Sequence, residues 1–338
     1  MINLLENISL KSFNTFGVEA KARFFAFIST VNELREIMQL KAEKQKLFIL
    51  GGGSNVLFTQ DVDGLVLINR TTGIERIDED ENSVTIKAGS GENWSDLVDF
   101  TVAQNLGGLE NMSLIPGSVG AAPVQNIGAY GVEQKDSMLS LEAMNLETGL
   151  IRTFTHLECE FGYRYSIFKN HEKGKWFILN VSYRLLKYPQ INLNYKPLKE
   201  YFSDKDASEI SLKQISEAVK SIRRSKLPDP KVLGNGGSFF KNPIITKQDF
   251  LPMQKKFPTI PFYELPDGKI KLAAGWLIEQ CGWKGRNQGQ AGVHKNQALV
   301  LVNLGNAKGA DILNLAKAIQ ADVWNKFGIK LEAEVSII

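Results

Sequence analysis

The sequence predicts an α+β protein built from two units in series. Three observations predict this class: strand and helix signals alternate in the first half, glycine-rich loops separate them, and longer helices follow a proline-containing break at residues 187–190. Hydrophobic residues make up 43% of the 338 residues and charged residues 23%, which provides apolar material for two or three cores. This composition excludes disordered, collagen-like and coiled-coil classes.

The first half alternates short strands with helices. A strand is expected at residues 23–28, and Thr30 with Glu33 forms a capping box that begins a helix burying Leu34 and Ile37. Further strands are expected at residues 46–50, 56–58, 65–68, 84–88 and 176–186, with a hairpin over 139–154 that turns at 147–149. A helix beginning at Trp94 is expected to end near Gly107.

The second half carries longer helices. Ser211 and Gln214 form a second capping-box pair, before a helix that buries Leu212 and Ile215 and ends at the prolines of residues 226–230. We expect a helix at 272–280, a strand at 297–303, a helix at 311–327 and a closing strand at 331–338. Apolar and polar residues alternate along the closing strand, which predicts one buried face.

Histidine and cysteine are too scarce for several common kinds of site. The chain has three histidines, His156, His171 and His294, and two cysteines, Cys159 and Cys281. Only His156 and Cys159 lie at a metal-ligand spacing, so no metal site is expected. No histidine lies in a nucleophile motif, which disfavours a serine or cysteine hydrolase. Two cysteines far apart suit a reducing compartment.

Charge is more informative in its distribution than in its total. The chain has 40 Lys and Arg against 37 Asp and Glu, a formal net charge of +3. Residues 111–132 carry no charge, yet their prolines and glycines would leave backbone groups unpaired in lipid, so we expect no membrane helix there. The first residues lack the basic start of a targeting signal.

Three glycine-rich loops in the first half indicate a bound ligand. Residues 51–55 follow a strand and lead into apolar residues, unlike a Walker or dinucleotide loop, yet consecutive glycines can turn several N–H groups toward one pyrophosphate. For this loop alone a plain turn is an equally good interpretation. Residues 89–91 and 115–131 have the same character, and because glycines there alternate with apolar residues, ligand contact is favoured over a flexible linker.

Three other side chains are candidates for chemistry, and each has a simpler interpretation. Arg164 lies among aromatic residues, where an Arg stacked on Tyr is common at surfaces. Ser238 lies in a glycine-rich segment before Lys241 and Asn242, and either belongs to a turn or delivers a proton. Glu334 lies on the polar face of the closing strand, where a solvated Glu is the usual case.

Together these motifs resemble the UDP-N-acetylenolpyruvoylglucosamine reductases, the flavoenzymes that make UDP-N-acetylmuramate for peptidoglycan. The resemblance covers nearly the whole chain. It depends on residues 14–17, 50–58, 115–131, 163–166, 226–230, 234–242, 272–278 and 331–335. One such motif would be weak evidence, whereas this many in order is strong evidence.

The resemblance implies a fold, a cofactor and a set of site residues. The fold is a two-part FAD-binding unit of the vanillyl-alcohol-oxidase (PCMH) type over residues 1–187, divided near residue 70, and an α+β substrate-binding domain over 195–338. The implied residues for non-covalent FAD binding are Gly51, Gly52, Gly53, Ser54, Asn55, Gly89, Ser90, Pro116, Gly117, Ser118, Gly120, Ala121, Asn126, Gly128 and Tyr130. The implied substrate-binding residues are Tyr195, Lys226, Asn242, Lys271 and Gln297.

The resemblance also implies the reaction. NADPH reduces the flavin, and a hydride then passes to the enolpyruvyl carbon of the UDP-sugar. Arg164 meets the enolate charge, Glu334 helps if burial keeps it protonated as a donor, and Ser238 supplies the proton beside a cation such as Lys226. Because FAD carries the redox chemistry, the enzyme needs few His or Cys residues.

One position departs from the family pattern. Many members carry an Arg two residues after the catalytic Glu, whereas this chain has Ser336. Another cation is then needed for the substrate diphosphate, and Lys271 and Lys241 are the candidates.

Two other functions stay open at this stage. One is another flavin oxidoreductase of the same fold, such as an alcohol or sugar oxidase, although a histidine tether for FAD is not available before His156. The other is a nucleotide-binding protein without turnover. We expect a cytoplasmic monomer that takes a small-molecule UDP-sugar and has no nucleic-acid or membrane partner.

Overall fold

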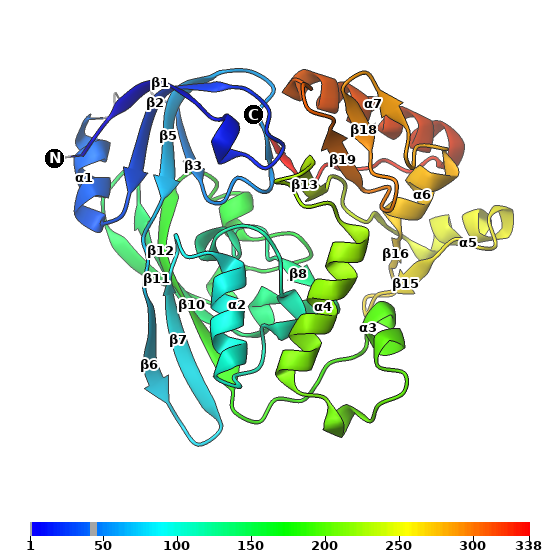
Figure 1. The fold of residues 1–338 in the computed structure, drawn as a ribbon, viewed down its shortest axis with the longest axis horizontal. Coiled ribbons are helices and arrows are strands. Elements are labelled where there is room, and N and C mark those ends of the chain that lie inside the picture. Colours follow the sequence, from blue (N-terminus) through cyan, green and yellow to red (C-terminus); the bar gives the residue numbers. More distant parts are fainter. Residues whose placement is uncertain (1, 41–45) are drawn as a thin grey trace. The chain divides into compact units, whose positions relative to one another are not determined.

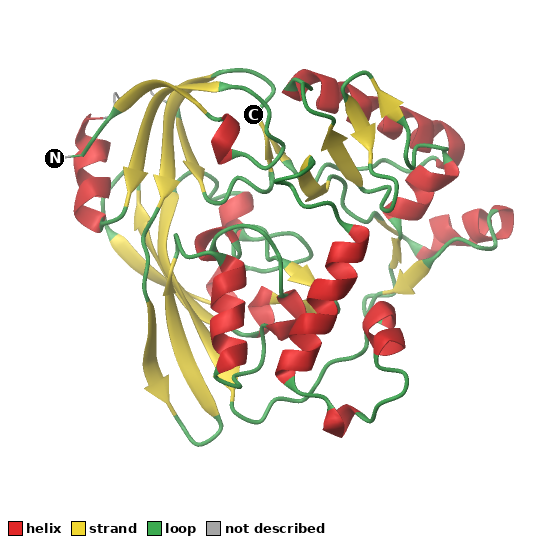
Figure 2. Cartoon of the chain, viewed as in Figure 1, coloured by secondary structure: helices red, strands yellow, loops and turns green. Residues whose placement is uncertain are grey.

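The computed structural model describes residues 2–40 and 46–338 and divides into two compact units (Figure 1). Apart from the undescribed residues, unit 1 comprises residues 1–8, 22–52 and 62–224, and unit 2 comprises 9–21, 53–61 and 225–338. Figure 2 shows helices and strands in both units, which confirms the predicted α+β class.

The first sheet of unit 1 has the strand order β1 (Leu5–Ser9), β2 (Lys21–Ile28), β5 (Val62–Asn69) and β3 (Leu47–Leu50). Strands β2 and β3 both pair with β5 in parallel. Helix α1 (Val31–Leu40) begins at the predicted capping box, in which the Glu33 N–H donates to Thr30 Oγ1 and the Thr30 N–H donates to the Glu33 carboxylate, both at 3.2 Å. The helix buries Leu34 and Ile37, as predicted.

The second sheet of unit 1 is antiparallel. Its strand order is β11 (Ile151–Thr155), β10 (Met138–Asn145), β12 (Trp176–Leu186), β7 (Ser83–Gly89) and β6 (Ile74–Glu79). The predicted hairpin and long strand are confirmed, whereas β6 was not predicted because nearly all its side chains are exposed and show no alternation. Phe177 and Leu179 of β12 share a core with Ala26 and Leu65 of the first sheet.

Three helices complete unit 1: α2 (Trp94–Ala103), α3 (Lys196–Tyr201) and α4 (Leu212–Lys226). Helix α2 ends earlier than predicted, because Asn105 takes a left-handed φ of 56° and the Leu106 N–H donates back to the Thr101 carbonyl at 3.0 Å. The start of α4 confirms the second capping box, with the Gln214 N–H donating to Ser211 Oγ at 3.2 Å. Helices α3 and α4 share a buried cluster that also packs Tyr130.

Unit 2 contains two small antiparallel sheets, three helices and one parallel strand pair. The first sheet has the order β13 (Gly234–Ser238), β19 (Val300–Asn303), β18 (Ala291–Val293) and β17 (Asn287–Gln288), and the second has β14 (Ile244–Ile245), β16 (Ile270–Leu272) and β15 (Phe262–Glu264). The helices are α5 (Lys247–Lys256), α6 (Ala274–Gln280) and α7 (Gly309–Phe327). Strands β4 (Val56–Leu57) and β20 (Ser336–Ile337) pair in parallel.

The closing strand is shorter than predicted. Only Ser336–Ile337 is a strand, although 331–338 was predicted. Ahead of it, Ala333 forms an isolated bridge with Phe240, and the Leu331 carbonyl accepts a hydrogen bond from Gln320 of α7 at 2.8 Å. Residues 331–335 are therefore held by a single bridge and by side-chain hydrogen bonds, and not by pairing along a strand.

Two other elements of unit 2 also begin later than predicted. The strand expected from residue 297 begins at Val300, and the helix expected from residue 272 begins at Ala274 because Leu272 pairs within the second sheet. Within residues 2–40 and 46–338, no helix combines the length and the apolar character needed to span a membrane. Residues 111–132 form short 3₁₀ turns and the two-residue strands β8 (Gly128–Ala129) and β9 (Val132–Glu133).

The first turn of α7 packs against a loop that leaves no room for a side chain. A Cβ on Gly309 would overlap the Phe58 carbonyl oxygen, whereas one on Gly328, the C-cap of the same helix, would meet nothing within 4 Å. We expect Gly309→Ala to lower the free energy of unfolding by about 3 kcal/mol. Gly328→Ala should cost about 1 kcal/mol, because its φ of 68° is left-handed. Urea unfolding measures both, and equal losses would contradict the packing argument.

Candidate functional site

Two of the predicted glycine loops pack directly against each other in unit 1. A Cβ on Gly52 would lie 2.8 Å from the Cα of Gly117, and one on Gly51 would overlap the Ser118 hydroxyl. Among the described residues, the backbone N–H groups of Gly51 and Gly52 donate no hydrogen bond. Close backbone approach and open N–H groups are what a pyrophosphate nest requires.

The third glycine loop joins the same cluster. The Gly120 N–H donates to the Ser90 carbonyl at 2.8 Å, and a Cβ on Gly120 would lie 2.5 Å from the Ser90 Cβ. The Trp94 N–H donates to the Gly117 carbonyl at 3.0 Å. Ala121 ends the short 3₁₀ helix that begins beside Ser118. The three loops are therefore contiguous, which no single motif could establish.

Two residues predicted to bind FAD have side chains that are already engaged. The fully buried Ser90 hydroxyl donates to the Ile178 carbonyl at 2.6 Å. The fully buried Asn126 amide donates to the Glu133 carboxylate at 2.8 Å and to the Gly162 carbonyl at 3.0 Å. Both side chains hold the loops together, so any contact of these residues with FAD would have to come from their backbone.

Arg164 is held against the same glycine-rich loop. Its Nη2 donates to the Gly128 carbonyl at 3.0 Å, and its Nη1 lies 3.5 Å from the Asn126 carbonyl. The guanidinium carbon also lies 5.5 Å from the Tyr163 ring. Its φ of 56° is unusual for a residue with a side chain. The chain thus maintains an uncommon backbone conformation to place this guanidinium on the loop.

Tyr195 and Tyr130 form a ring pair in unit 1. Tyr195 is the N-cap of α3, and its ring centroid lies 5.3 Å from that of Tyr130 at an interplanar angle of 76°. Burial raises the pKa of the Tyr130 hydroxyl, although the nearby Arg223 charge partly offsets this. Arg223 was not among the predicted site residues. It lies four residues after the buried Val219, and this spacing, which places its side chain toward the buried face of α4, could have indicated it.

In unit 2, a bulge presents Ser238 at the end of β13. Asn235 pairs with Val302 and Ser238 with Val300, so β13 has one extra residue between the two pairs. Gly237 makes the bend with φ of 68°, and its N–H donates to Asn235 Oδ1 at 2.9 Å. The glycines of this segment therefore shape the strand end that carries the serine hydroxyl.

Glu334 lies beside Ser238 through the backbone. The Glu334 N–H donates to the Phe239 carbonyl at 2.8 Å, and its own carbonyl accepts from Asn55 Nδ2 at 3.2 Å. The half-buried Glu334 and Ser238 thus belong to one constellation in unit 2, together with the last residue of the first glycine loop.

The other predicted substrate residues of unit 2 have structural contacts as well. Asn242 Oδ1 accepts from the Ala274 N–H at 3.0 Å at the start of α6, and Gln297 Oε1 accepts from the Leu299 N–H at 3.3 Å. Lys226 is exposed at the end of α4. These contacts fix the positions of the two amides.

Lys241 and Lys271, the two candidates for the charge that relatives supply with an Arg at position 336, have different contacts. Lys241 Nζ pairs with the Glu332 carboxylate at 3.3 Å, which compensates its charge. Lys271, in the middle of the second sheet of unit 2, lies with Nζ 5.7 Å from the Tyr263 ring centroid. Both lysines therefore have contacts within unit 2, one with a carboxylate and one with an aromatic ring.

Burial disfavours the thiolate form of both cysteines. Burial raises the pKa of the Cys159 thiol to about 12 and also raises that of the half-buried Cys281. Across the two described ranges, no cluster of three or more His, Cys, Asp or Glu side chains could hold a metal ion.

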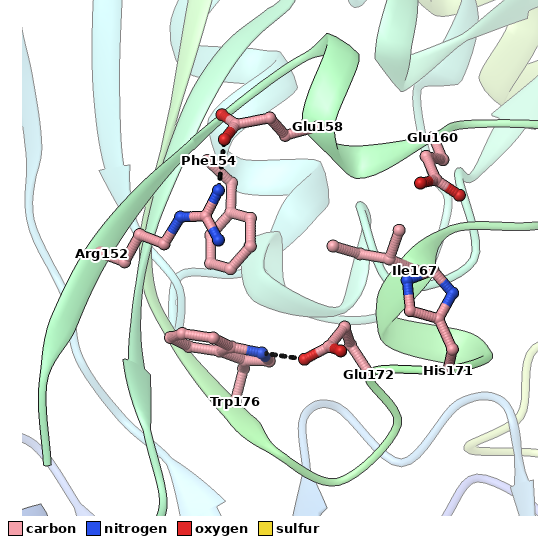
Figure 3. Close-up of a pocket in the computed structure, with 8 residues that line it drawn as sticks. All are labelled: Arg152, Phe154, Glu158, Glu160, Ile167, His171, Glu172 and Trp176. Atoms are coloured by element: carbon pink, nitrogen blue, oxygen red, sulfur yellow. Dashed lines mark hydrogen bonds and ion pairs between the residues drawn. The ribbon is translucent and has the colours of Figure 1, made fainter. Parts of the chain in front are cut away.

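A pocket of about 300 Å³ lies elsewhere in unit 1, and no predicted site residue lines it (Figure 3). Arg152 pairs with Glu158 at its edge, and Trp176 Nε1 donates to the Glu172 carboxylate at 2.7 Å. The Arg152 and Glu158 charges thus pair with each other, whereas the indole that contacts Glu172 is neutral.

In unit 1, contiguous glycine loops beside a fixed guanidinium suit a flavin-binding site, and in unit 2 a serine and a carboxyl group lie on segments joined by a backbone hydrogen bond. Residues 22–155 match the family model described as "FAD binding domain", and residues 229–338 match "UDP-N-acetylenolpyruvoylglucosamine reductase, C-terminal domain". The chain belongs to the UDP-N-acetylenolpyruvoylglucosamine reductase family.

Full-length relatives support this membership. The chain is 53% identical over all 338 residues to the UDP-N-acetylenolpyruvoylglucosamine reductase of Flavobacterium johnsoniae, covering 100% of both chains. It is 46% identical to that of Pseudomonas putida, covering 98% of each. The crystal structure of the Thermus caldophilus reductase, 22% identical, superposes with a TM-score of 0.70 over 100% of this chain and 98% of its own. The predicted fold class, a PCMH-type FAD-binding unit followed by a substrate-binding domain, is confirmed.

Proposed function

We propose that this protein reduces UDP-N-acetylenolpyruvoylglucosamine to UDP-N-acetylmuramate with NADPH, as an FAD-dependent enzyme of peptidoglycan precursor synthesis. The observation that carries the proposal is 53% identity over the full length of a reductase of that name. The contiguous glycine loops and the Ser238–Glu334 constellation support it independently, because they supply an anion nest, and a hydroxyl and a carboxyl group on segments joined by a backbone hydrogen bond.

The glycine loops fit FAD. Gly51 and Gly52 against Gly117 and Ser118 provide a surface without side chains in which N–H groups can face the pyrophosphate. When bound, FAD supplies the hydride-transfer chemistry that the chain's own residues lack. The residues of this cluster would bind and orient the cofactor, and would exclude water from it.

Replacement of Gly52 tests this cradle. We expect Gly52→Ala to weaken FAD binding by about a hundredfold, because the new methyl group would force the two glycine loops apart. The control Gly149→Ala is in the turn between β10 and β11, at a φ of 71°, with nothing within 4 Å of the new methyl group. It should keep its FAD. Flavin fluorescence on titration into the apoproteins measures both affinities, and equal affinities would contradict the proposed cradle.

The remaining residues would act on the substrate. In this proposal Arg164 offers a guanidinium fork to the substrate carboxylate, Ser238 protonates the carbon next to it, and Glu334 donates a hydrogen bond to the developing enolate. Lys271 or Lys241 would contact the diphosphate in place of the family's usual Arg, since this chain has Ser336 at that position. Tyr195, Lys226, Asn242 and Gln297 would contact the rest of the UDP-sugar.

Three further properties belong to the same proposal. The FAD-binding domain would span residues 1–187, with a division near residue 70, and the substrate-binding domain 195–338. The enzyme would work as a monomer. It would act in the cytoplasm, without a membrane or nucleic-acid partner.

The test is NADPH consumption by the purified protein. We expect yellow protein that, without oxygen, oxidises one NADPH per flavin by itself and oxidises more only when the enolpyruvyl UDP-sugar is added, with a product heavier by two hydrogen atoms. An alcohol or sugar oxidase would instead oxidise its substrate with oxygen and without NADPH. A colourless protein that takes up no flavin would refute the proposal that this protein is a flavoenzyme.

A further inference from the structure

A buried asparagine joins the two segments that carry Tyr130 and Tyr195. Asn111 is 1% exposed, and its Nδ2 donates to the carbonyl oxygens of Tyr130 and of Asn192, each at 3.0 Å. Its Oδ1 accepts no hydrogen bond within the described part of the chain. Because both partners are carbonyl oxygens, only the amide nitrogen can face them, which fixes the orientation of the side chain.

Tyr130 occupies a backbone conformation that needs such a restraint. Its φ of 50° lies in the left-handed region, which is uncommon for a residue with a side chain. Its ring packs on the cluster of α3 and α4 and meets the Tyr195 ring edge to face. Fixing the Tyr130 backbone therefore fixes the surface on which the Tyr195 ring rests.

The segment that carries Asn111 is itself anchored. Ser113 Oγ donates to Ser216 Oγ of α4 at 2.9 Å, and the Leu114 carbonyl accepts from Arg223 Nε at 3.2 Å. Asn111 therefore connects both tyrosine segments to a fixed point in the core of unit 1.

We propose that Asn111 is a positioning residue that holds Tyr130 and Tyr195 as one rigid pair, and so orients the Tyr195 ring for the UDP-sugar. The identity of the ligand rests on the proposed function. Asn111 itself would touch neither substrate nor cofactor. Its loss should therefore weaken substrate binding and leave the reduction of bound flavin by NADPH unchanged.

Calorimetric titration of the oxidised, FAD-loaded enzyme with the enolpyruvyl UDP-sugar measures binding without turnover. We expect Asn111→Leu to raise the Kd about tenfold, the effect of losing two buried hydrogen bonds. The rate of flavin reduction by NADPH should stay within about twofold of wild type. The control Thr101→Val removes a buried hydrogen bond of α2, from Thr101 Oγ1 to the Val98 carbonyl at 2.9 Å, so it should lower the melting temperature while leaving the Kd within about twofold.

A double-mutant cycle with Tyr195→Ala separates positioning from general destabilisation. If Asn111 acts through the Tyr195 ring, Asn111→Leu should change the Kd by less than about twofold once that ring is gone. An unchanged Kd in the single variant, or the same loss in both backgrounds, would overturn the inference. Asn111→Ser, which removes the same donors, replaces Asn111→Leu in the cycle if that variant does not fold. A wild-type enzyme that binds no UDP-sugar would instead refute the proposed function.

Discussion

Ser238→Ala should separate the two halves of the proposed reaction. We expect the bound flavin to be reduced by NADPH at close to the wild-type rate, because the serine has no role in that step. Reoxidation of the flavin by the enolpyruvyl substrate should slow by about a thousandfold or more, since the substrate carbon next to the carboxylate then lacks its proton donor. Stopped-flow absorbance follows both steps in one preparation.

Ser238→Cys provides the matched comparison at the same bulge. The thiol keeps a proton donor of similar size at the end of β13, so this variant should reoxidise faster than Ser238→Ala. A structural role in the β13 bulge would instead slow both half-reactions together in Ser238→Ala. That outcome would exclude Ser238 as the proton donor.

Replacements of Glu334 test whether its carboxyl group works as a hydrogen-bond donor. Gln keeps a donor of the same length, so we expect Glu334→Gln to stay within about tenfold of the wild-type reoxidation rate. Glu334→Ala should lower the reoxidation rate by about 10²- to 10³-fold, the usual effect of removing one hydrogen-bond donor to a developing oxyanion. Glu334→Asp should fall nearer to Ala, because it draws the donor back by one methylene group.

Glu332→Gln is the control for the Glu334 series. Glu332 lies two residues earlier, its side chain is 68% exposed, and its partner is Lys241. An exposed ion pair of this kind contributes little, so the control should react at nearly the wild-type rate. If Glu334→Gln is the slowest of the three variants, Glu334 does not act as a protonated donor.

Local sequence rules predicted the elements whose signals lie within a few residues of each other. The capping boxes at Thr30 and Ser211 formed as expected, since their partners are three residues away. Strand β6 was not predicted because its side chains are exposed. The closing strand was predicted to be too long, because alternation of apolar and polar residues does not reveal whether a partner strand exists. Pairing between distant segments was therefore the main source of error.

The candidate site shows the same limit. Glycine content indicated each loop separately, but only the fold shows that Gly52 abuts Gly117 and that Gly120 abuts Ser90. Nor did sequence indicate Asn111, whose role depends on two carbonyl groups from distant segments. Chemical residue types were thus predictable from motifs, whereas the residues that position them were not.

Anaerobic reduction of the FAD-loaded enzyme followed by addition of substrate tests the proposed reaction most directly. NADPH should bleach the flavin absorbance near its visible maximum, and the enolpyruvyl UDP-sugar should then restore it without oxygen, with one UDP-N-acetylmuramate formed per flavin. If the absorbance stays bleached until air is admitted, the enzyme is not a reductase of this substrate.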